Sequence, residues 1–267
     1  MYMRMKKKRR SKKYQSKQKK KRIIIASIIA FVVIAVIAVF VILSKPPLSY
    51  NKYNAFGIYM PVEYAIHGID ISRYQGSINW QMVKEVHIDS IKIGFAFMKA
   101  TEGIESSDPN FKENWVKSKH AGIPRGAYHF FLADRDGTLQ AKNFITNVQL
   151  EPGDLPPVVD VEKLSGVPKA QLIKELKEYI AVIEGHYGVK PIIYTYAFFY
   201  KENLQNELSD YPLWIAHYEL EDRRPQLDRD WQFWQHSEKG NVSGINVKVD
   251  MNVFYGDSLL FKEMLIN

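Results

Sequence analysis

The side chains best suited to catalysis in this sequence are two carboxylates, Asp160 and Glu162, which end an apolar run over residues 156–162. The run is short, rich in valine and opened by two prolines, so it predicts a buried strand rather than a helix. Side chains alternate between the faces of a strand, which places both carboxylates on one face with their backbones about 6–7 Å apart. Two acids this close are costly to bury unless one keeps its proton while the other ionises. An isolated pattern of this kind also occurs as two solvated charges, so its meaning depends on the rest of the chain.

The elements around this strand predict an α/β fold, because strand-like and helix-like stretches alternate from about residue 65 onward. The clearest helix covers residues 169–187, where apolar side chains recur every three or four positions and Gly188 follows. Eight strand candidates predict a closed or nearly closed barrel of parallel strands. The expected strands cover residues 65–72, 91–100, 125–131, 156–162, 191–196, 213–217, 231–236 and 244–255, and the other expected helices cover residues 80–86, 110–120, 138–148 and 258–265.

A barrel of this type would bring four distant carboxylates to one end. Active sites of β/α barrels lie at the C-terminal ends of the strands. Asp70 ends the first expected strand, Asp160 and Glu162 end the fourth, and Asp250 lies near the end of the last. A carboxylate cluster lined by aromatic rings suits a sugar chain, whose C–H faces stack on rings while its hydroxyls need acceptors. Aromatic side chains near the same strand ends are Tyr128, Phe130, Tyr194, Tyr196, Trp214, Tyr218, Trp231 and Trp234.

Several motifs, taken in order along the chain, resemble glycoside hydrolase family 25, the muramidases often called Chalaropsis-type lysozymes. The resemblance covers about residues 65–267, and each motif is weak alone whereas the ordered set is specific. The sequence departs from the family at His236, where relatives more often place an aromatic or a small polar residue. The motifs are GIDIS at residues 68–72, FMKATEG at 97–103, GAYHFF at 126–131, DVE at 160–162, PIIYTY at 191–196, LWIA at 213–216, WQ at 234–235 and VDMNVF at 249–254.

The resemblance implies a flattened (β/α)8-like barrel that cleaves peptidoglycan at the β-1,4 bond from N-acetylmuramic acid to N-acetylglucosamine. It implies that Glu162 is the general acid, and that Asp160 stays ionised and stabilises the transition state or an oxazolinium-like intermediate. An inverting route through an activated water remains open. Asp70 and Asp250 match the other two active-site acids, and no cofactor or metal is implied. The matching substrate-contact residues are Tyr128, Tyr194, Tyr196, Trp214 and Trp234.

The N-terminal sequence predicts a basic tail, a membrane anchor and a tether. Residues 1–22 contain 13 Lys or Arg and no acid, and the 21 residues 23–43 are apolar except for Ser27. As a helix they would span about 31 Å, the thickness of a bilayer's hydrocarbon core. The basic block predicts a cytoplasmic N-terminus and a catalytic domain on the periplasmic or extracellular side. Because no signal-peptidase site follows, we expect an uncleaved transmembrane helix, with residues 44–64 as a tether to a domain over residues 65–267.

The basic charge of the chain is confined to this tail. The net charge is +8, but beyond residue 22 the chain has 24 basic and 29 acidic residues, a net of −5. Nucleic-acid binding therefore loses its support, and contact of the tail with anionic lipid is the simpler interpretation. The absence of cysteine excludes disulfides and thiolate zinc sites. We expect peptidoglycan glycan strands and the lipid bilayer as partners, and a monomeric catalytic domain.

Two other functions fit parts of the sequence. A catalytically inactive, membrane-tethered module that binds peptidoglycan would explain the anchor, but it has no need of four clustered acids. A metal-dependent polysaccharide deacetylase would need an aspartate with two histidines, and His129, His217 and His236 all lie near expected strand ends. However, the sequence has no H-x-x-x-H pair to support such a site.

Overall fold

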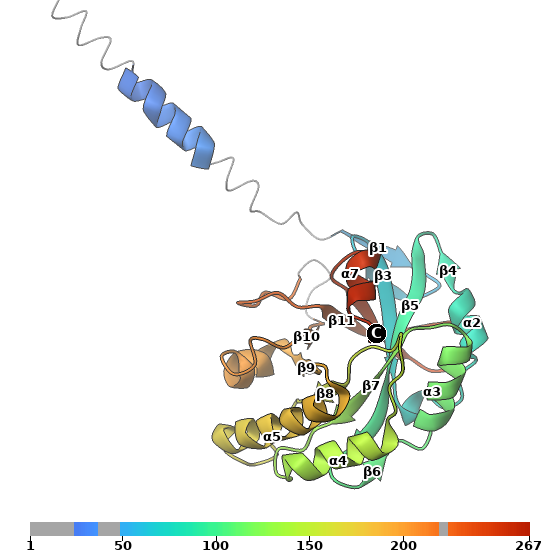
Figure 1. Ribbon diagram of the computed structural model, residues 1–267. Coiled ribbons are helices and arrows are strands. Elements are labelled where there is room, and N and C mark those ends of the chain that lie inside the picture. The colour runs from blue at the N-terminus through green and yellow to red at the C-terminus, as the bar shows by residue number, and fades with distance from the viewer. Residues whose placement is uncertain (1–23, 37–48, 219–223) are drawn as a thin grey trace, which may run out of the picture. The chain divides into compact units, whose positions relative to one another are not determined.

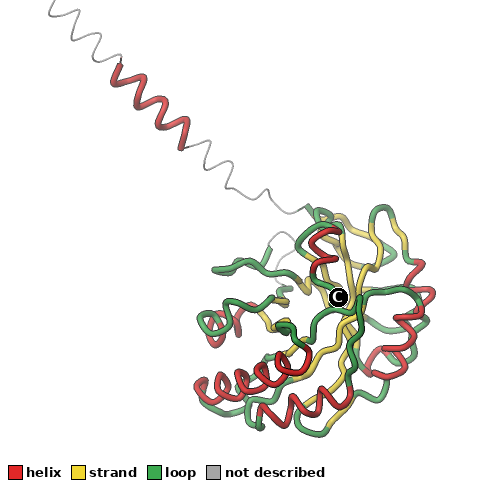
Figure 2. Tube along the Cα trace, viewed as in Figure 1, coloured by secondary structure: helices red, strands yellow, loops and turns green. Residues whose placement is uncertain are grey.

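The structure is a computed structural model that describes residues 24–36, 49–218 and 224–267. The chain forms two compact units, residues Met1–Pro47 and Leu48–Asn267. In the first unit, residues 24–36 are helical (Figure 2). Their large apolar side chains are exposed. No helix in the described ranges has the length and apolar character to cross a membrane. The expected basic tail and the remainder of the expected transmembrane segment 23–43 lie outside the described residues.

The second unit is built on eight strands that close into a barrel-like sheet (Figure 1). Their order is β3-β12-β11-β10-β9-β8-β7-β5, and β5 pairs back with β3. This confirms the expected eight-stranded α/β barrel. The strands are β3 (Ile66–Ile71), β5 (Ile91–Glu102), β7 (Arg125–Phe130), β8 (Val158–Asp160), β9 (Ile192–Tyr196), β10 (Leu213–Ala216), β11 (Phe233–Gly240) and β12 (Val249–Phe254).

The expectation of an all-parallel barrel was wrong for one strand. β12 runs antiparallel to both of its neighbours, β11 and β3, whereas the other barrel pairs are parallel. The connection between Gly240 and Val249 is too short for the crossover that a parallel strand needs, so the chain turns back directly.

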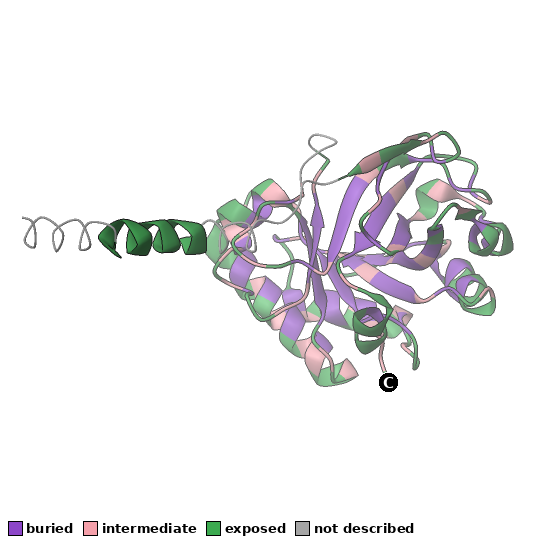
Figure 3. Cartoon of the chain, turned by 90° about the horizontal axis from the view of Figure 1, so that it is seen from above, coloured by how far each residue is buried: buried purple, intermediate pink, exposed green. Residues whose placement is uncertain are grey.

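Helices cover the outside of the barrel, with their outward faces exposed and the strands largely buried (Figure 3). The longest, α5 (Lys169–Tyr187), confirms the predicted helix, buries Leu172, Leu176 and Ile183, and ends at Gly188 with a left-handed φ of 70°. The others are α2 (Trp80–Glu85), α3 (Phe111–His120), α4 (Gly137–Asn147), α6 (Ala197–Phe199) running into η2 (Tyr200–Leu204), and α7 (Ser258–Glu263); short elements are η1 (Arg73–Gln75), β4 (His87–Ile88) and β6 (Ser106–Ser107).

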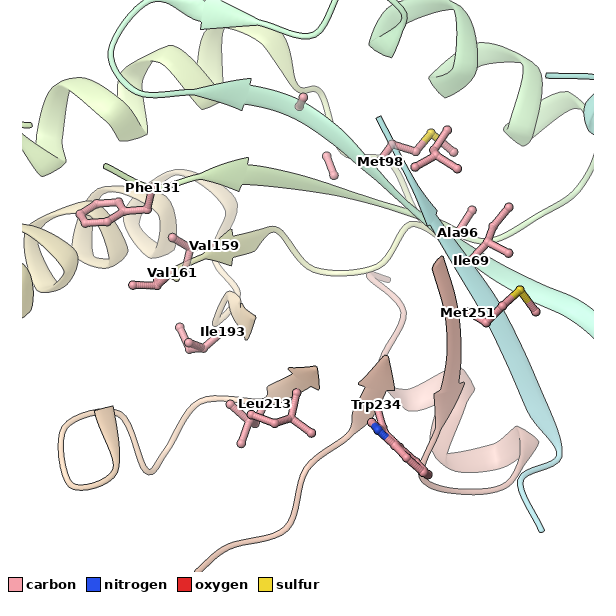
Figure 4. Packing of buried hydrophobic residues seen from close by; sticks show 14 of the residues in the cluster. Ile69, Ala96, Met98, Phe131, Val159, Val161, Ile193, Leu213, Trp234 and Met251 are labelled. Atoms are coloured by element: carbon pink, nitrogen blue, oxygen red, sulfur yellow. The ribbon is translucent and has the colours of Figure 1, made fainter. Parts of the chain in front are cut away.

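The core has two layers, as the alternation of side chains along the strands requires. Inside the barrel, rings from strands that are not neighbours touch: Phe97 of β5 stacks on Trp214 of β10 with centroids 4.3 Å apart, and Phe95 meets Phe233 at 5.2 Å. The alternate residues form an outer layer under the helices (Figure 4), which includes Ile69, Ala96, Met98, Phe131, Val159, Val161, Ile193, Leu213, Trp234 and Met251. The inner layer therefore stands directly beneath the mouth where the acids lie.

A hairpin ahead of the barrel belongs to the same folded unit. β1 (Tyr50–Tyr53) pairs antiparallel with β2 (Ile58–Pro61), and Phe56 and Met60 are buried in the outer core layer. The backbone N–H of Asn241 donates to the Phe56 carbonyl at 2.9 Å. Much of the expected tether over residues 44–64 is thus packed on the barrel, because its apolar side chains find a buried site there.

Two glycines make a matched test of helix packing. A Cβ on Gly137, at the start of α4, would lie 1.9 Å from the backbone oxygen of Glu175 in α5, whereas a Cβ on Gly185 would meet nothing within 4 Å. We expect Gly137→Ala to lower the free energy of unfolding by about 1–3 kcal/mol through overpacking. Gly185→Ala should instead raise it by up to about 1 kcal/mol, since alanine favours the helix. Denaturant unfolding of both variants measures the difference, and equal effects would contradict the close approach of α4 and α5.

Candidate active site

The structure brings the four predicted carboxylates together at one mouth of the barrel. Asp70 is the last residue but one of β3, Asp160 ends β8, and Glu162 follows it by two positions. Asp250 lies near the start of β12, not near its end as expected, and it reaches the same mouth because β12 is antiparallel and pairs Asp250 with Asp70. The charge of Glu162 contributes to the raised pKa values of the other three acids, so all four carboxylates lie close enough to interact.

Asp160 and Glu162 form a coupled pair. Asp160 is only 5% exposed, and burial is the main cause that raises the pKa of its carboxyl well above the ordinary value, followed by the charge of Glu162 and a hydrogen bond between the two side chains. A hydrogen bond between two carboxyl groups needs a proton on one of them, so the pair is suited to moving a proton between its two members. The Oδ1 atom of Asp160 is buried without a partner among the described residues.

Asp70 is held by two side-chain amides that the sequence analysis did not single out as site residues. Gln235 Nε2 and Asn252 Nδ2 each donate to Asp70 Oδ2 at 2.7 Å. Burial raises the pKa of Asp70 to about 6, against the lowering effect of these donors. Burial, followed by the charge of Asp70, raises the pKa of Asp250 to about 9. The three aspartates of this mouth therefore keep protons at a higher pH than solvated aspartates.

Three aromatic side chains fix the direction of these amides. Tyr194 donates its hydroxyl to Gln235 Oε1 at 2.7 Å, and Tyr218 donates to the same oxygen. Trp214 Nε1 donates to the side-chain oxygen of Asn252 at 2.8 Å. Because each amide oxygen accepts from a ring, each amide nitrogen must face Asp70.

The predicted substrate-contact residues differ in their exposure. Tyr196 is 37% exposed at the end of β9, and Tyr128 is half-buried next to the acids, whose charges add to burial in raising its pKa. Tyr194 is buried and serves the amide network. Trp214 lies inside the barrel and Trp234 in the outer layer, each 2% exposed, so both have little surface for a ligand.

A lysine inside the mouth was not foreseen as a site residue. Lys99 of β5 binds Glu102 at 2.5 Å and lies 4.9 Å from the centre of the Phe130 ring. Its positive charge lowers the pKa of Asp160, opposing the burial that raises it. The FMKATEG motif contained this lysine, but only the inward face of β5 identifies it as a neighbour of the acids.

The three histidines of the deacetylase alternative do not join this cluster. His129 faces the outer layer, where its ring nitrogens meet Thr101 Oγ1 at 2.7 Å and Gln140 Oε1 at 3.2 Å, and burial lowers its pKa to about 3. His236 neighbours Trp234 on β11 and lines a pocket outside the barrel with His217. Within the described ranges, no three His, Cys, Asp or Glu side chains are arranged to hold a metal ion.

Comparison with known proteins agrees with this geometry. The sequence model of glycosyl hydrolases family 25 matches residues 69–245. The chain is 44% identical to YegX of Escherichia coli strain K12 over 208 residues, which cover 78% of this chain and 76% of YegX. It is 33% identical to Lysozyme M1 of Streptomyces globisporus over 207 residues, covering 72% of this chain and 69% of that protein. A family 25 glycosyl hydrolase from Bacillus anthracis superposes with a TM-score of 0.70 and 34% identity, covering 81% of this chain and 100% of that one. The chain therefore belongs to glycosyl hydrolases family 25, and it is a glycoside hydrolase.

Proposed function

We propose that this protein is a peptidoglycan muramidase that hydrolyses the β-1,4 bond from N-acetylmuramic acid to N-acetylglucosamine. The observation that carries the proposal is the hydrogen-bonded Asp160–Glu162 pair at the mouth of the barrel, beside the half-buried Tyr128 and the exposed Tyr196. The similarity to Lysozyme M1 supports the same substrate class.

In this mechanism the substrate binds to the form of the pair in which Glu162 carries the proton, and Glu162 gives that proton to the glycosidic oxygen as the bond to the anomeric carbon breaks. Asp160 remains as a carboxylate and stabilises the positive charge that develops on the sugar. Its unpartnered Oδ1 supports a neighbouring-group route, since it can accept a hydrogen bond from the acetamido N–H of the muramic acid while the acetamido oxygen bonds to the anomeric carbon. Water then gives a proton to Glu162 and attacks that carbon, which opens the ring formed by the acetamido group and restores the acid. Asp70, held by Gln235 and Asn252, adds negative charge at the same mouth.

The test is to treat purified peptidoglycan with the full chain in detergent and to identify the new reducing ends by mass spectrometry after borohydride reduction. Reduced muramic acid ends are expected. Reduced glucosamine ends would show that the enzyme cleaves the other glycosidic bond of the glycan. Acetate released without new ends would support the deacetylase. Retained binding with no product of either kind would support the inactive wall-binding module.

We further propose that the chain is anchored in the bilayer by residues 23–43, with its N-terminus in the cytoplasm and its catalytic domain on the periplasmic or extracellular side. The apolar run in the sequence and the exposed apolar side chains of the helix over residues 24–36 support the anchor, and the preceding basic block supports the orientation. Alkaline extraction of membranes, with protease added to intact spheroplasts, tests both points. Release by alkali would contradict the anchor, and protection from protease would contradict the orientation.

A further inference from the structure

A pocket of about 360 Å³ lies between the N-terminal hairpin and the outer side of β11. The hairpin contributes Lys52 and Tyr59 to its lining, and the barrel contributes Tyr218, His236 and Lys239. The hairpin lies outside residues 69–245, the part of the chain that matches family 25. The pocket is therefore bounded on one side by the hairpin and on the other by the barrel.

The hairpin is fixed in place, so the pocket is preformed. Phe56 and Met60 are 1% and 0% exposed, and they hold the hairpin against the barrel. Gly57 has a φ of 70°, and a Cβ there would lie 2.6 Å from Asn241 Nδ2, so a larger residue would be strained and would have to displace the Asn241 side chain. A ligand in the pocket would not have to order the hairpin first.

The pocket adjoins the acid mouth. Tyr218 lines the pocket and donates its hydroxyl to Gln235, which in turn donates to Asp70 at 2.7 Å. Glu238 also lines the pocket, and its charge is among the causes that raise the pKa of Asp250. A substrate bound at the acids can therefore extend over Tyr218 into the pocket.

The two lysines of the pocket are not paired with an acid in the described part of the chain. Lys52 and Lys239 form no salt bridge with any described residue, and Lys52 Nζ lies 5.9 Å from the centre of the Tyr59 ring. His236 is 9% exposed, and its Nε2 has no hydrogen-bond partner among the described residues. That atom lies below the surface of the pocket, so the charge of the two lysines, and not the imidazole, is what the pocket offers a ligand.

We propose that this pocket binds the anionic peptide stem of the peptidoglycan strand whose glycan occupies the acid mouth. The sugar rings of the strand carry no charge, whereas the stem on the lactyl group of muramic acid carries carboxylates. Two lysines against the single Glu238 leave the pocket net positive, next to a mouth of four acids. Only the stem gains from those cations. This inference rests on the proposed function, because it assigns the same substrate.

The test compares two soluble ligands, a glycan oligomer with its stems and the same oligomer after the stems are removed. Calorimetry uses the full chain in detergent with Glu162→Gln to prevent turnover. We expect the stem-bearing ligand to bind about 10-fold more tightly, and Lys52→Gln with Lys239→Gln to remove that advantage without changing affinity for the bare glycan. Lys112→Gln, an exposed lysine of α3 that forms no salt bridge with a described residue, is the matched control.

Each outcome separates this inference from the proposed function. Equal affinity for both ligands would overturn stem binding and leave the muramidase standing. An equal loss for both ligands in the double variant would make the pocket a sugar site and also overturn the inference. The stem-bearing ligand could bind more tightly while the unsubstituted chain cuts neither ligand. That result would support the pocket and contradict the muramidase. Failure to bind either ligand would contradict both.

Discussion

Replacing Glu162 with glutamine is expected to lower kcat on peptidoglycan by about 10³-fold, within the usual range for the loss of a general acid. Glutamine preserves the size of the side chain but has no acidic proton to give to the leaving oxygen. It also removes the negative charge that contributes to the raised pKa of Asp160. Kinetics of reducing-end release, together with the affinity for glycan, should show a loss confined largely to kcat.

Activity on a second substrate tests whether Glu162 acts as the proton donor. An aryl glycoside with an acidic phenol as leaving group needs little protonation, so the Glu162→Gln variant should lose far less activity on it than on peptidoglycan. Glu263→Gln, an exposed glutamate of α7, is the matched control and should behave as the unsubstituted chain. An equal loss on both substrates would contradict the role of proton donor.

The elements that carry the acids could be predicted because their signals are local. The buried strand ending at Asp160 and the periodic helix α5 depend on side-chain patterns within a few residues, and both agree with the structure. The direction of β12 depends on which strands it joins and on the length of the connection before it. No pattern inside residues 249–254 contains that information, and so Asp250 was placed at the wrong end of its strand.

The amide network could not be derived from residue types alone. Gln235 and Asn252 act on Asp70 because both point into the barrel, and a shift of one residue in register would turn them outward. The same register separates two tryptophans that look alike in sequence: Trp214 points inward and supports Asn252, whereas Trp234 points into the outer layer. Which face a strand-end side chain takes is decided by pairing across the whole barrel.

The acid cluster opposes folding at neutral pH, and this makes its function testable by stability as well as by rate. The native pKa of Asp160 is raised above the value in the unfolded chain, chiefly by burial. Between those two values the native state holds more protons than the unfolded state, so stability falls as pH rises through that window. The penalty is present at pH 8 and disappears toward pH 4, where the unfolded carboxyl is protonated as well.

Replacing Asp160 with asparagine should therefore stabilise the protein while it inactivates the enzyme. We expect kcat to fall by about 10²–10³-fold, because the amide cannot neutralise the positive charge on the sugar. Asparagine ionises at no pH and can still donate to Glu162, so the variant should unfold at a higher temperature than the unsubstituted chain at pH 8, with the difference shrinking toward pH 4. Calorimetry at both pH values, run beside the kinetics, measures the two effects. A variant that is inactive but no more stable at pH 8 would mean that the buried carboxylate of Asp160 does not destabilise the fold. Its role would then have to come from packing or from its contact with Glu162.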